Sequence, residues 1–325
     1  MRIPQRVKFF AKAVATVGLL ALAISSVGTD AILNVTTEID PVWVLGAVCL
    51  VGVIVLLEAL QFKEVARLHG HELPYPTSLY MTLVGRFFSL FTPAMVGTDI
   101  YRAASMHQRG SGMRHAVGTV AAARIMSLVA LIPVLLAGLP AIASVLGMGL
   151  PLLVAAGVTG TALLGTVALV LLAIFGRPLV ERLRYALVRH AVNLADDIIQ
   201  VVSVPPPRSW AWVTATAQHL VRVLAFTALG QAYGLDAGVI VFFALVPVSL
   251  LLAMVPISLG SWGLREVTLI YSLGLVGVPG AEALAVSVTF GLIGLTYGLS
   301  GGVLWGLSSG QSGSHSPPGE TERPT

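Results

Sequence analysis

Charged residues are scarce in this sequence. They make up 10% of its 325 residues, whereas hydrophobic residues make up 56%, and soluble domains carry roughly 25% charged residues. A soluble domain is therefore excluded, and the composition predicts an integral membrane protein. The net charge of +4 does not indicate nucleic-acid binding, because the basic residues lie in loops between apolar segments, where they mark orientation.

The sequence also has little of what redox, metal or nucleotide chemistry requires. Its single cysteine, Cys49, lies inside an apolar run, so no intrachain disulfide can form and no thiolate metal site is expected. Walker A, HExxH and DxD motifs are missing, and no Ser/His/Asp set stands out. We therefore expect no enzymatic activity, no cofactor and no metal.

What the sequence does contain is a series of apolar stretches of about 20 residues, the length of a membrane-spanning helix. Continuous runs of this kind exclude an outer-membrane barrel, whose strands alternate. The N-terminal run follows a basic segment, and a cleaved signal peptide is the alternative there. We expect six full spans, at about 13–27, 42–62, 117–139, 152–175, 210–233 and 282–307.

Two segments break this pattern, LFTPAMVGTDIYR at 90–102 and VPISLGSWGLRE at 255–266. In each, a proline is followed four residues later by a glycine and nine residues later by an arginine. Broken, charged segments at matching places in two halves of a membrane protein indicate a transport site. The motif residues are Pro93, Gly97 and Arg102 in the first copy, and Pro256, Gly260, Gly263 and Arg265 in the second.

Charge placement predicts that both segments are re-entrant. Basic residues flank the first element, about 77–99, on both sides, and basic flanks stay in the cytoplasm. The second, about 237–277, would enter from outside. Each half then has the order span, span, hairpin, span, which makes an inverted-topology repeat. In a rival model both elements cross fully, but Arg102, Arg109 and Arg114 then lie outside, against the charge rule.

The expected organisation is one all-α polytopic domain over residues 1–309, with repeat halves at about 7–139 and 151–307. A cytoplasmic loop covers 176–209, and the Ser-, Gly- and Pro-rich tail at 310–325 is predicted to be disordered. The basic N-terminus and the charge distribution place both termini in the cytoplasm, in an inner or plasma membrane.

Charged side chains inside the apolar segments are the candidate functional residues. A charge at the bilayer centre costs about 2.5–3.5 kcal/mol on insertion scales, so such residues pair, face a cavity or meet a charged ligand. Five arginines stand against three acids, and a lipid phosphate could neutralise the excess because guanidinium forks match phosphate oxygens. The candidate substrate-binding residues are Arg86, Asp99, Arg102, Arg124, Arg222, Arg265 and Glu266.

Purely structural roles remain open for these residues. Arg124 could lock the bundle by pairing with Asp99 or with Glu58, and Asp99 could instead pair with Arg102 three residues on. Adjacent charges such as Arg265 and Glu266 could be a local pair. His219, one turn before Arg222, could be a hydrogen-bonded interior residue or a proton relay.

At these residues the sequence resembles a known family. PAMVGTDIYRA is similar to the P-x-x-x-G-G-D-x-x-R element of the flippase-like transmembrane family of lysylphosphatidylglycerol synthases, and PISLGSWGLRE to its later P-x-s-x-G-G-x-G-x-R-E element. Thr98 and Ser261 replace the second glycine of each pair. Arg124 fits a recurrent arginine of the family. The resemblance covers about residues 7–307 and implies lipid translocation, without the synthase domain of the two-part members.

The resulting expectation is a lipid transporter or flippase for an anionic or modified lipid, either an aminoacyl phospholipid or a polyprenyl-phosphate-linked one. Its partners would be membrane lipids with anionic headgroups and, in a second reading, a separately encoded lipid synthase or glycosyltransferase that docks at 176–209. A membrane-embedded transferase is the third reading, but it needs a nucleophile or metal pair that the sequence does not show.

Overall fold

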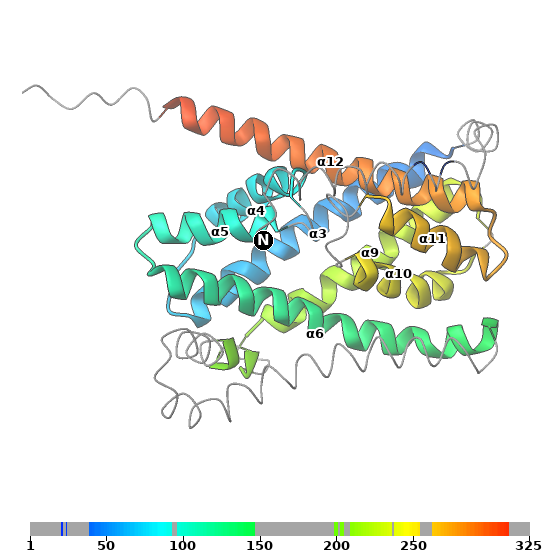
Figure 1. Ribbon diagram of the computed structural model, residues 1–325, viewed down its shortest axis with the longest axis horizontal. Coiled ribbons are helices and arrows are strands. Elements are labelled where there is room, and N and C mark those ends of the chain that lie inside the picture. The colour runs from blue at the N-terminus through cyan, green and yellow to red at the C-terminus, as the bar shows by residue number, and fades with distance from the viewer. Residues whose placement is uncertain are drawn as a thin grey trace, which may run out of the picture.

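The structure, a computed structural model, describes Ala21, Ile24 and residues 39–92, 96–146, 198–200, 202–204, 209–235, 237–253 and 262–311. These residues form helices and no strands, which confirms the all-α prediction (Figure 1). The helices are α3 Pro41–Leu68, α4 Tyr75–Ser89, α5 Gly97–Gln108, α6 Met113–Leu146, α9 Ala211–Ala232, α10 Val239–Ala253, α11 Leu264–Gly274 and α12 Gly280–Gln311.

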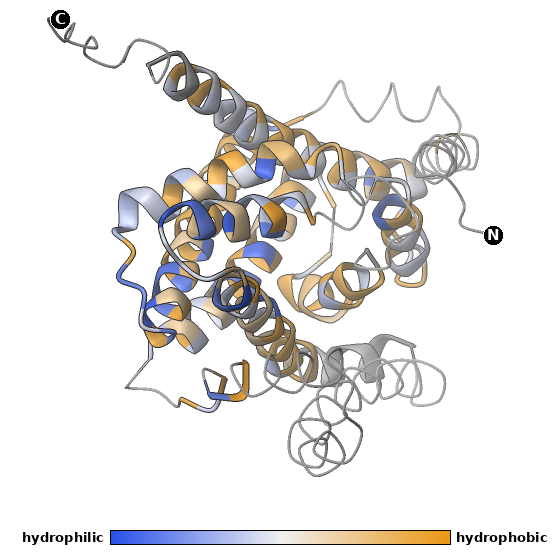
Figure 2. Cartoon of the chain, turned by 60° about the vertical axis from the view of Figure 1, so that its left-hand side comes forward, coloured by the Kyte–Doolittle hydropathy of each residue, from blue (hydrophilic) through white to orange (hydrophobic). Residues whose placement is uncertain are grey.

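Three of these helices are long and apolar enough to cross a membrane, namely α3, α6 and α12. They coincide with the spans predicted at 42–62, 117–139 and 282–307, although each helix continues beyond the apolar stretch. The start of α3 is fixed locally, because Pro41 occupies the first turn and the Asp40 carboxylate accepts a hydrogen bond from the Val42 amide at 2.8 Å. In Figure 2 the helices are predominantly hydrophobic.

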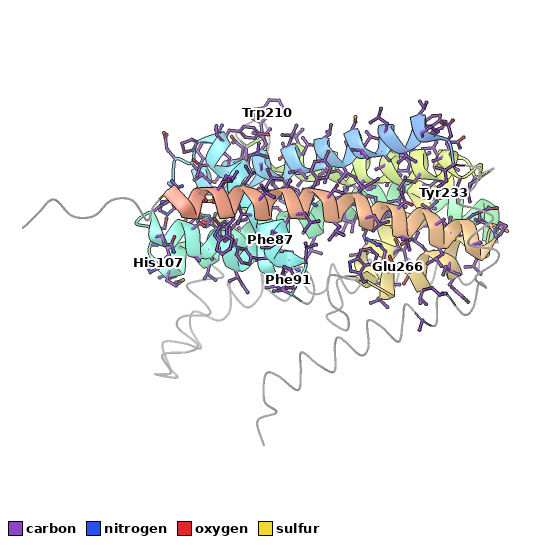
Figure 3. All side chains as sticks on the ribbon, turned by 90° about the horizontal axis from the view of Figure 1, so that it is seen from above. Phe87, Phe91, His107, Trp210, Tyr233 and Glu266 are labelled. Atoms are coloured by element: carbon purple, nitrogen blue, oxygen red, sulfur yellow. The ribbon has the colours of Figure 1, made fainter. Side chains whose placement is uncertain are left out.

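Helix α9 lies in the interior of the bundle and packs along α3. The two helices are antiparallel, because the Asp40 amide before α3 donates to the Ala232 carbonyl at the end of α9. With 22 residues, α9 is about 33 Å long, enough to cross a bilayer. Trp210 and Tyr233 lie toward its two ends (Figure 3).

Four helices are too short to cross a bilayer alone, since 11 to 15 residues span about 16–23 Å. They form two pairs, α4 with α5 and α10 with α11, and the members of each pair pack against each other. The pairs lie toward opposite ends of the molecule (Figures 1 and 3). Helix α12 packs against α4 of one pair and α11 of the other.

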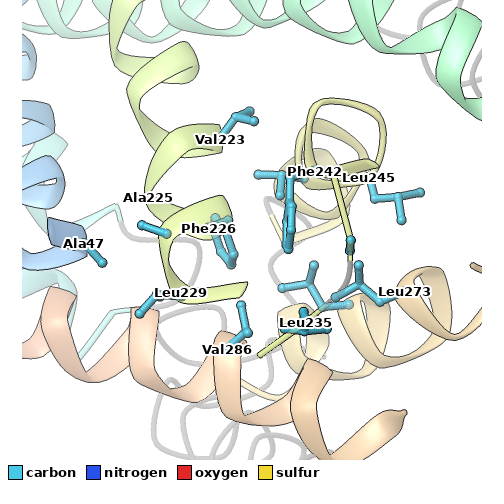
Figure 4. Close-up of a cluster of buried hydrophobic side chains, with 14 of the residues drawn as sticks. Ala47, Val223, Ala225, Phe226, Leu229, Leu235, Phe242, Leu245, Leu273 and Val286 are labelled. Carbon is cyan, nitrogen blue, oxygen red and sulfur yellow. The ribbon is translucent and has the colours of Figure 1, made fainter. Parts of the chain in front are cut away.

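The buried apolar side chains form two clusters with a polar zone between them. One cluster contains Ala47, Val51 and Ile54 of α3 together with residues of α9 to α12 (Figure 4). The other contains Phe62 and Val65 of α3 together with residues of α4, α5 and the start of α6. The stretch of α3 between the two clusters therefore marks the middle of the bundle.

Several predictions fall outside the described residues. These are the span at 13–27 apart from Ala21 and Ile24, the span at 152–175, nearly all of the loop at 176–209, the tail beyond residue 311, and Pro93, Pro256 and Gly260 of the break motifs. The described residues do cover both flanks of each break, so the environment of the two short helix pairs can be followed up to the break itself.

Candidate functional site

A cavity of about 270 Å³ lies in the polar zone between the two clusters. Both broken elements reach it: Ser89 and Leu90 come from the end of α4, and Trp262 and Arg265 from the start of α11. The long helices α3, α6, α9 and α12 supply the remaining walls. The charged or titratable residues that line the cavity are Glu58, Arg86, Arg124, His219, Arg222 and Arg265.

The two broken elements meet on one face of α12. A β-carbon at Gly298 would lie 3.2 Å from Leu90 of the first element, and one at Gly291 would lie against Trp262 and Arg265 of the second. These glycines are seven residues apart, which is two turns and about 10 Å along the helix. The glycines of α12 thus allow both elements to approach the same central stretch.

Hydroxyl groups join the two described flanks of the first break. The Ser89 hydroxyl accepts from the Thr98 amide at 2.8 Å, and the Thr92 hydroxyl accepts from the Gly97 amide at 2.8 Å. Gly97 is required for space, because a β-carbon there would collide with the backbone of Phe88 and Ser89. The Thr98 hydroxyl also hydrogen-bonds to the Ser89 hydroxyl at 2.8 Å, so its side chain adds to this contact.

Glu58 is the central carboxylate of the cavity and it binds two arginines. Arg86 of α4 approaches one carboxylate oxygen at 2.8 Å, and Arg222 of α9 approaches the other at 3.2 Å. All three side chains are mostly buried, with 13–21% of their surface exposed. One negative charge thus neutralises only one of two guanidinium groups, so this part of the cavity has an excess of one positive charge.

His219 supports Arg222 as a neutral imidazole. The Arg222 guanidinium can only donate, so His219 Nδ1, at 3.1 Å from it, must accept. The proton is then on Nε2, which donates to the Ser127 carbonyl at 2.8 Å. This arrangement confirms the interpretation of His219 as a hydrogen-bonded interior residue, and it fixes Arg222 at the cavity wall.

Arg124 forms an ion pair with Asp99, which joins α6 to the first turn of α5. One of the two pairings considered for Arg124 is thus found, whereas the i, i+3 pair of Asp99 with Arg102 is not the arrangement seen. The carboxylate at this position also faces the positive end of the α5 dipole. Asp99 does not line the cavity, so it acts on the site through Arg124.

Arg102 of α5 contacts two residues that lie one helical turn from Glu58 on α3 and from Arg86 on α4. Its guanidinium donates to the Thr82 hydroxyl at 2.8 Å and lies 4.4 Å from the centre of the Phe62 ring. Thr82 precedes Arg86 by four residues on α4, and Phe62 follows Glu58 by four on α3, so each is a same-face neighbour. Within the described part of the chain, the buried Nε of Arg102 has no hydrogen-bond partner.

The second element is organised by Glu266, which is fully buried. Its carboxylate accepts from the Gly263 amide at 2.6 Å and from Arg265 at 2.5 Å. Gly263 has a φ of 88°, a conformation that favours glycine, and it precedes the first residue of α11. Ser287 of α12 accepts from Arg265 Nε at 3.1 Å, and so the guanidinium is held against the cavity.

A comparison with known families shows which family the chain belongs to. The model of the lysylphosphatidylglycerol synthase TM region matches residues 9–301, which include both broken elements and every residue of the cavity. The chain belongs to this family. No curated protein matches the chain. It is accordingly a membrane protein that carries the membrane domain of lysylphosphatidylglycerol synthase-like proteins.

Within this family domain, the seven predicted site residues divide into two groups. The cavity is lined by four of them, Arg86, Arg124, Arg222 and Arg265. Outside the lining, Asp99 forms an ion pair with Arg124, and Glu266 forms one with Arg265. Arg102 is packed behind the cavity. No group of three or more metal-ligating side chains occurs in the portions of the chain that the structure describes.

Three polar or aromatic residues of the cavity, together with Glu58, are not among the binding residues predicted from the sequence. Glu58 is named from the sequence only as a possible partner of Arg124, yet it lines the cavity. Gln218 donates to Gln61 at 2.7 Å, an amide pair across α9 and α3, and Ser127 and Trp262 complete the wall. Trp262 lies inside the second break motif, and Gln218 is next to His219. Their positions beside residues already singled out from the sequence could have identified both as candidates.

Proposed function

We propose that this protein transports a phosphate-bearing lipid between the leaflets of a membrane, without catalysing a chemical reaction. The cavity supports the proposal, because four arginines from four different helices converge on it in the middle of an apolar bundle. Buried charges are retained where they pair or meet a charged ligand. Guanidinium groups bind phosphate oxygens through two parallel hydrogen bonds.

The size and lining of the cavity fit a lipid headgroup. Its volume of about 270 Å³ lies below the roughly 300–1,000 Å³ of pockets for drug-sized ligands, so it has room for a headgroup but not for acyl chains. Beyond Glu58 the lining becomes apolar, with Val51, Ile54 and Leu131. A ligand with a phosphate at one end and hydrocarbon at the other would match both parts.

We further propose an inverted-topology arrangement, with six full spans and two re-entrant pairs, α4–α5 and α10–α11. Three features support it: the four helices are too short to cross, the pairs lie at opposite ends of the molecule, and both reach one central cavity. Broken helices that meet near the midplane from two repeats are the usual setting of a transporter site. Both termini would then be cytoplasmic.

A leaflet-resolved assay in proteoliposomes tests the proposal. Fluorescent lipids with phosphate headgroups are placed in one leaflet, and their appearance in the other is followed by chemical quenching. We expect Arg86→Gln with Arg222→Gln to lower the rate at least about tenfold, because hydrogen bonds to charged groups contribute roughly 1.5–3 kcal/mol each. Arg109→Gln, at the exposed end of α5, is the control and should keep the wild-type rate.

Two outcomes would contradict the transport proposal. Unchanged rates in the double variant would show that the cavity does not carry the lipid. Formation of a new lipid species from labelled precursors by the purified protein would instead indicate a transferase. Transport by the protein alone would exclude a role limited to assisting a separate synthase.

A further inference from the structure

The buried charges around the cavity do not balance. Five arginines are involved, the four of the wall and Arg102 directly behind it. The carboxylates that contact them are Glu58, Asp99 and Glu266. Five positive charges against three negative ones leave two in excess, while His219 is neutral by its hydrogen bonds.

The excess is localised rather than spread over the site. Arg124 and Arg265 each have a carboxylate of their own. Arg86 and Arg222 share Glu58, which leaves one unneutralised charge at that point. Arg102 of α5 contacts the Thr82 hydroxyl and the Phe62 ring instead of a carboxylate, and these two residues lie one turn from Arg86 and Glu58. Arg102 therefore adds the second charge.

No other described acid offsets this charge. Glu64, the next buried carboxylate on α3, is held by Arg67 at 2.9 Å. The Gln61–Gln218 amide pair and the hydroxyl groups of Ser89 and Ser127 near the cavity carry no charge. Neighbouring positive charges in a medium of low dielectric repel strongly, so the binding free energy of an anion at this point gains more from a second negative charge than it would in water.

On the basis of the transport function proposed above, we infer that the headgroup is a phosphate with two negative charges, that is, a terminal phosphomonoester or a diphosphate diester. A phosphomonoester carries about 1.5–2 negative charges at pH 7 and three acceptor oxygens. Those oxygens can accept from the forks of Arg86 and Arg222 together. A phosphodiester lipid has one charge and two free oxygens, so it leaves one positive charge unmatched.

The same charge count argues against aminoacylated phospholipids as the preferred ligand of this chain. A lysyl or alanyl ester adds one or two ammonium groups to a phosphodiester, so the headgroup becomes neutral or positive. Such a headgroup would raise the positive excess or leave it unchanged. The structure therefore separates the substrate class of this domain from the lipid in the family's name.

Binding to the purified full-length protein in lipid nanodiscs tests the inference. The probes are phosphatidic acid, phosphatidylglycerol and lysylphosphatidylglycerol of identical acyl chains, with inorganic phosphate and diphosphate as soluble competitors. We expect phosphatidic acid to bind at least about tenfold more tightly than phosphatidylglycerol, and lysylphosphatidylglycerol to bind most weakly. The soluble anions should compete only at much higher concentration, because they lack the hydrocarbon part.

Two variants at one position separate charge from folding. Arg102→Gln removes one excess charge, so the preference for phosphatidic acid should fall at least about threefold, whereas Arg102→Lys keeps the charge and the preference. Equal affinity for phosphatidic acid and phosphatidylglycerol, or tightest binding of lysylphosphatidylglycerol, would overturn the dianion inference while leaving lipid transport intact. Diphosphate that binds as tightly as the lipid would assign the site to a soluble anion, and an absence of lipid movement would reject the transport proposal itself.

Discussion

At the level of single residues, Glu58 determines how the positive charges of the cavity are neutralised. Its two oxygens bind Arg86 and Arg222 on opposite sides, so the carboxylate holds together two guanidinium groups that would otherwise repel. Breaking a buried ion pair by removing one partner costs about 3–5 kcal/mol, because the other charge remains without compensation. At Glu58 such a change would leave two uncompensated charges.

We therefore expect Glu58→Gln, which preserves the shape of the side chain, to destabilise the purified protein by about 3 kcal/mol or more. A phosphate-bearing lipid should stabilise this variant more than it stabilises the wild type, because the lipid replaces the missing charge. Thermal unfolding in detergent, with and without added lipid, measures both effects. Glu72→Gln, at an exposed position, is the matched control, and an equally stable Glu58→Gln protein would contradict the assigned role.

Arg265 provides a second test at this scale, since Ser287 and Glu266 fix its position. Its Nε donates to the Ser287 hydroxyl, and its terminal nitrogen donates to Glu266. Ser287→Ala should keep the charge but loosen the guanidinium, so we expect lipid transport to fall about three- to tenfold, the value of one hydrogen bond of roughly 1 kcal/mol. Ser300→Ala, on the exposed side of α12, should leave the rate unchanged, and equal rates in the two variants would argue against this positioning role.

At the level of elements, the short helices depend on close backbone contact. The start of α5 lies against the end of α4, and Gly97 leaves no room for a side chain between them. Packing therefore explains the glycine of the first motif. In the second motif, Gly263 has a positive φ, a backbone conformation that favours glycine.

Gly97→Ala should consequently separate α4 from α5 and destabilise the protein by about 1–3 kcal/mol, the usual cost of overpacking. Gly46→Ala on α3 is the control, because a β-carbon there would meet no atom within 4 Å. The melting temperatures of both variants in one detergent provide the comparison. A Gly97→Ala protein as stable as Gly46→Ala would show that the two helices can move apart without cost.

The sequence predicted the elements better than the contacts between them. Apolar runs located α3, α6 and α12, because a span of about 20 residues leaves a continuous signal. The sequence left the partner of Asp99 open between Arg102, three residues on, and Arg124 on another helix, and the ion pair found is with Arg124. Pairings of that kind depend on how helices pack, and a single sequence carries no direct record of packing.

For the whole molecule, the orientation of the two helix pairs in the membrane distinguishes the inverted arrangement from its rival. The inverted arrangement places Gln108, at the end of α5, in the cytoplasm and Leu275, just after α11, outside. The rival arrangement, with both elements spanning, places both residues outside. Both are exposed in the structure, so either position can carry a label without disturbing the core.

We expect Gln108→Cys to be protected from a membrane-impermeant maleimide in intact cells and Leu275→Cys to react with it. Cys49 is replaced by serine beforehand, because it is exposed and would otherwise react. Permeabilised cells, in which both cysteines should be labelled, are the control. Labelling of Gln108→Cys from outside would reject the inverted topology, while leaving the cavity and its charges as described.

The double contact of Glu58 has a mechanical consequence for the proposed transport cycle. Arg86 belongs to the short helix α4 and Arg222 to the long helix α9. The Glu58 carboxylate of α3 therefore connects these helices through its two ion pairs. An incoming phosphate that takes both guanidinium groups would make the same bridge and release the carboxylate. In this scheme Glu58 would occupy the position of the phosphate whenever no lipid is bound, and it would then keep α4 attached to α9.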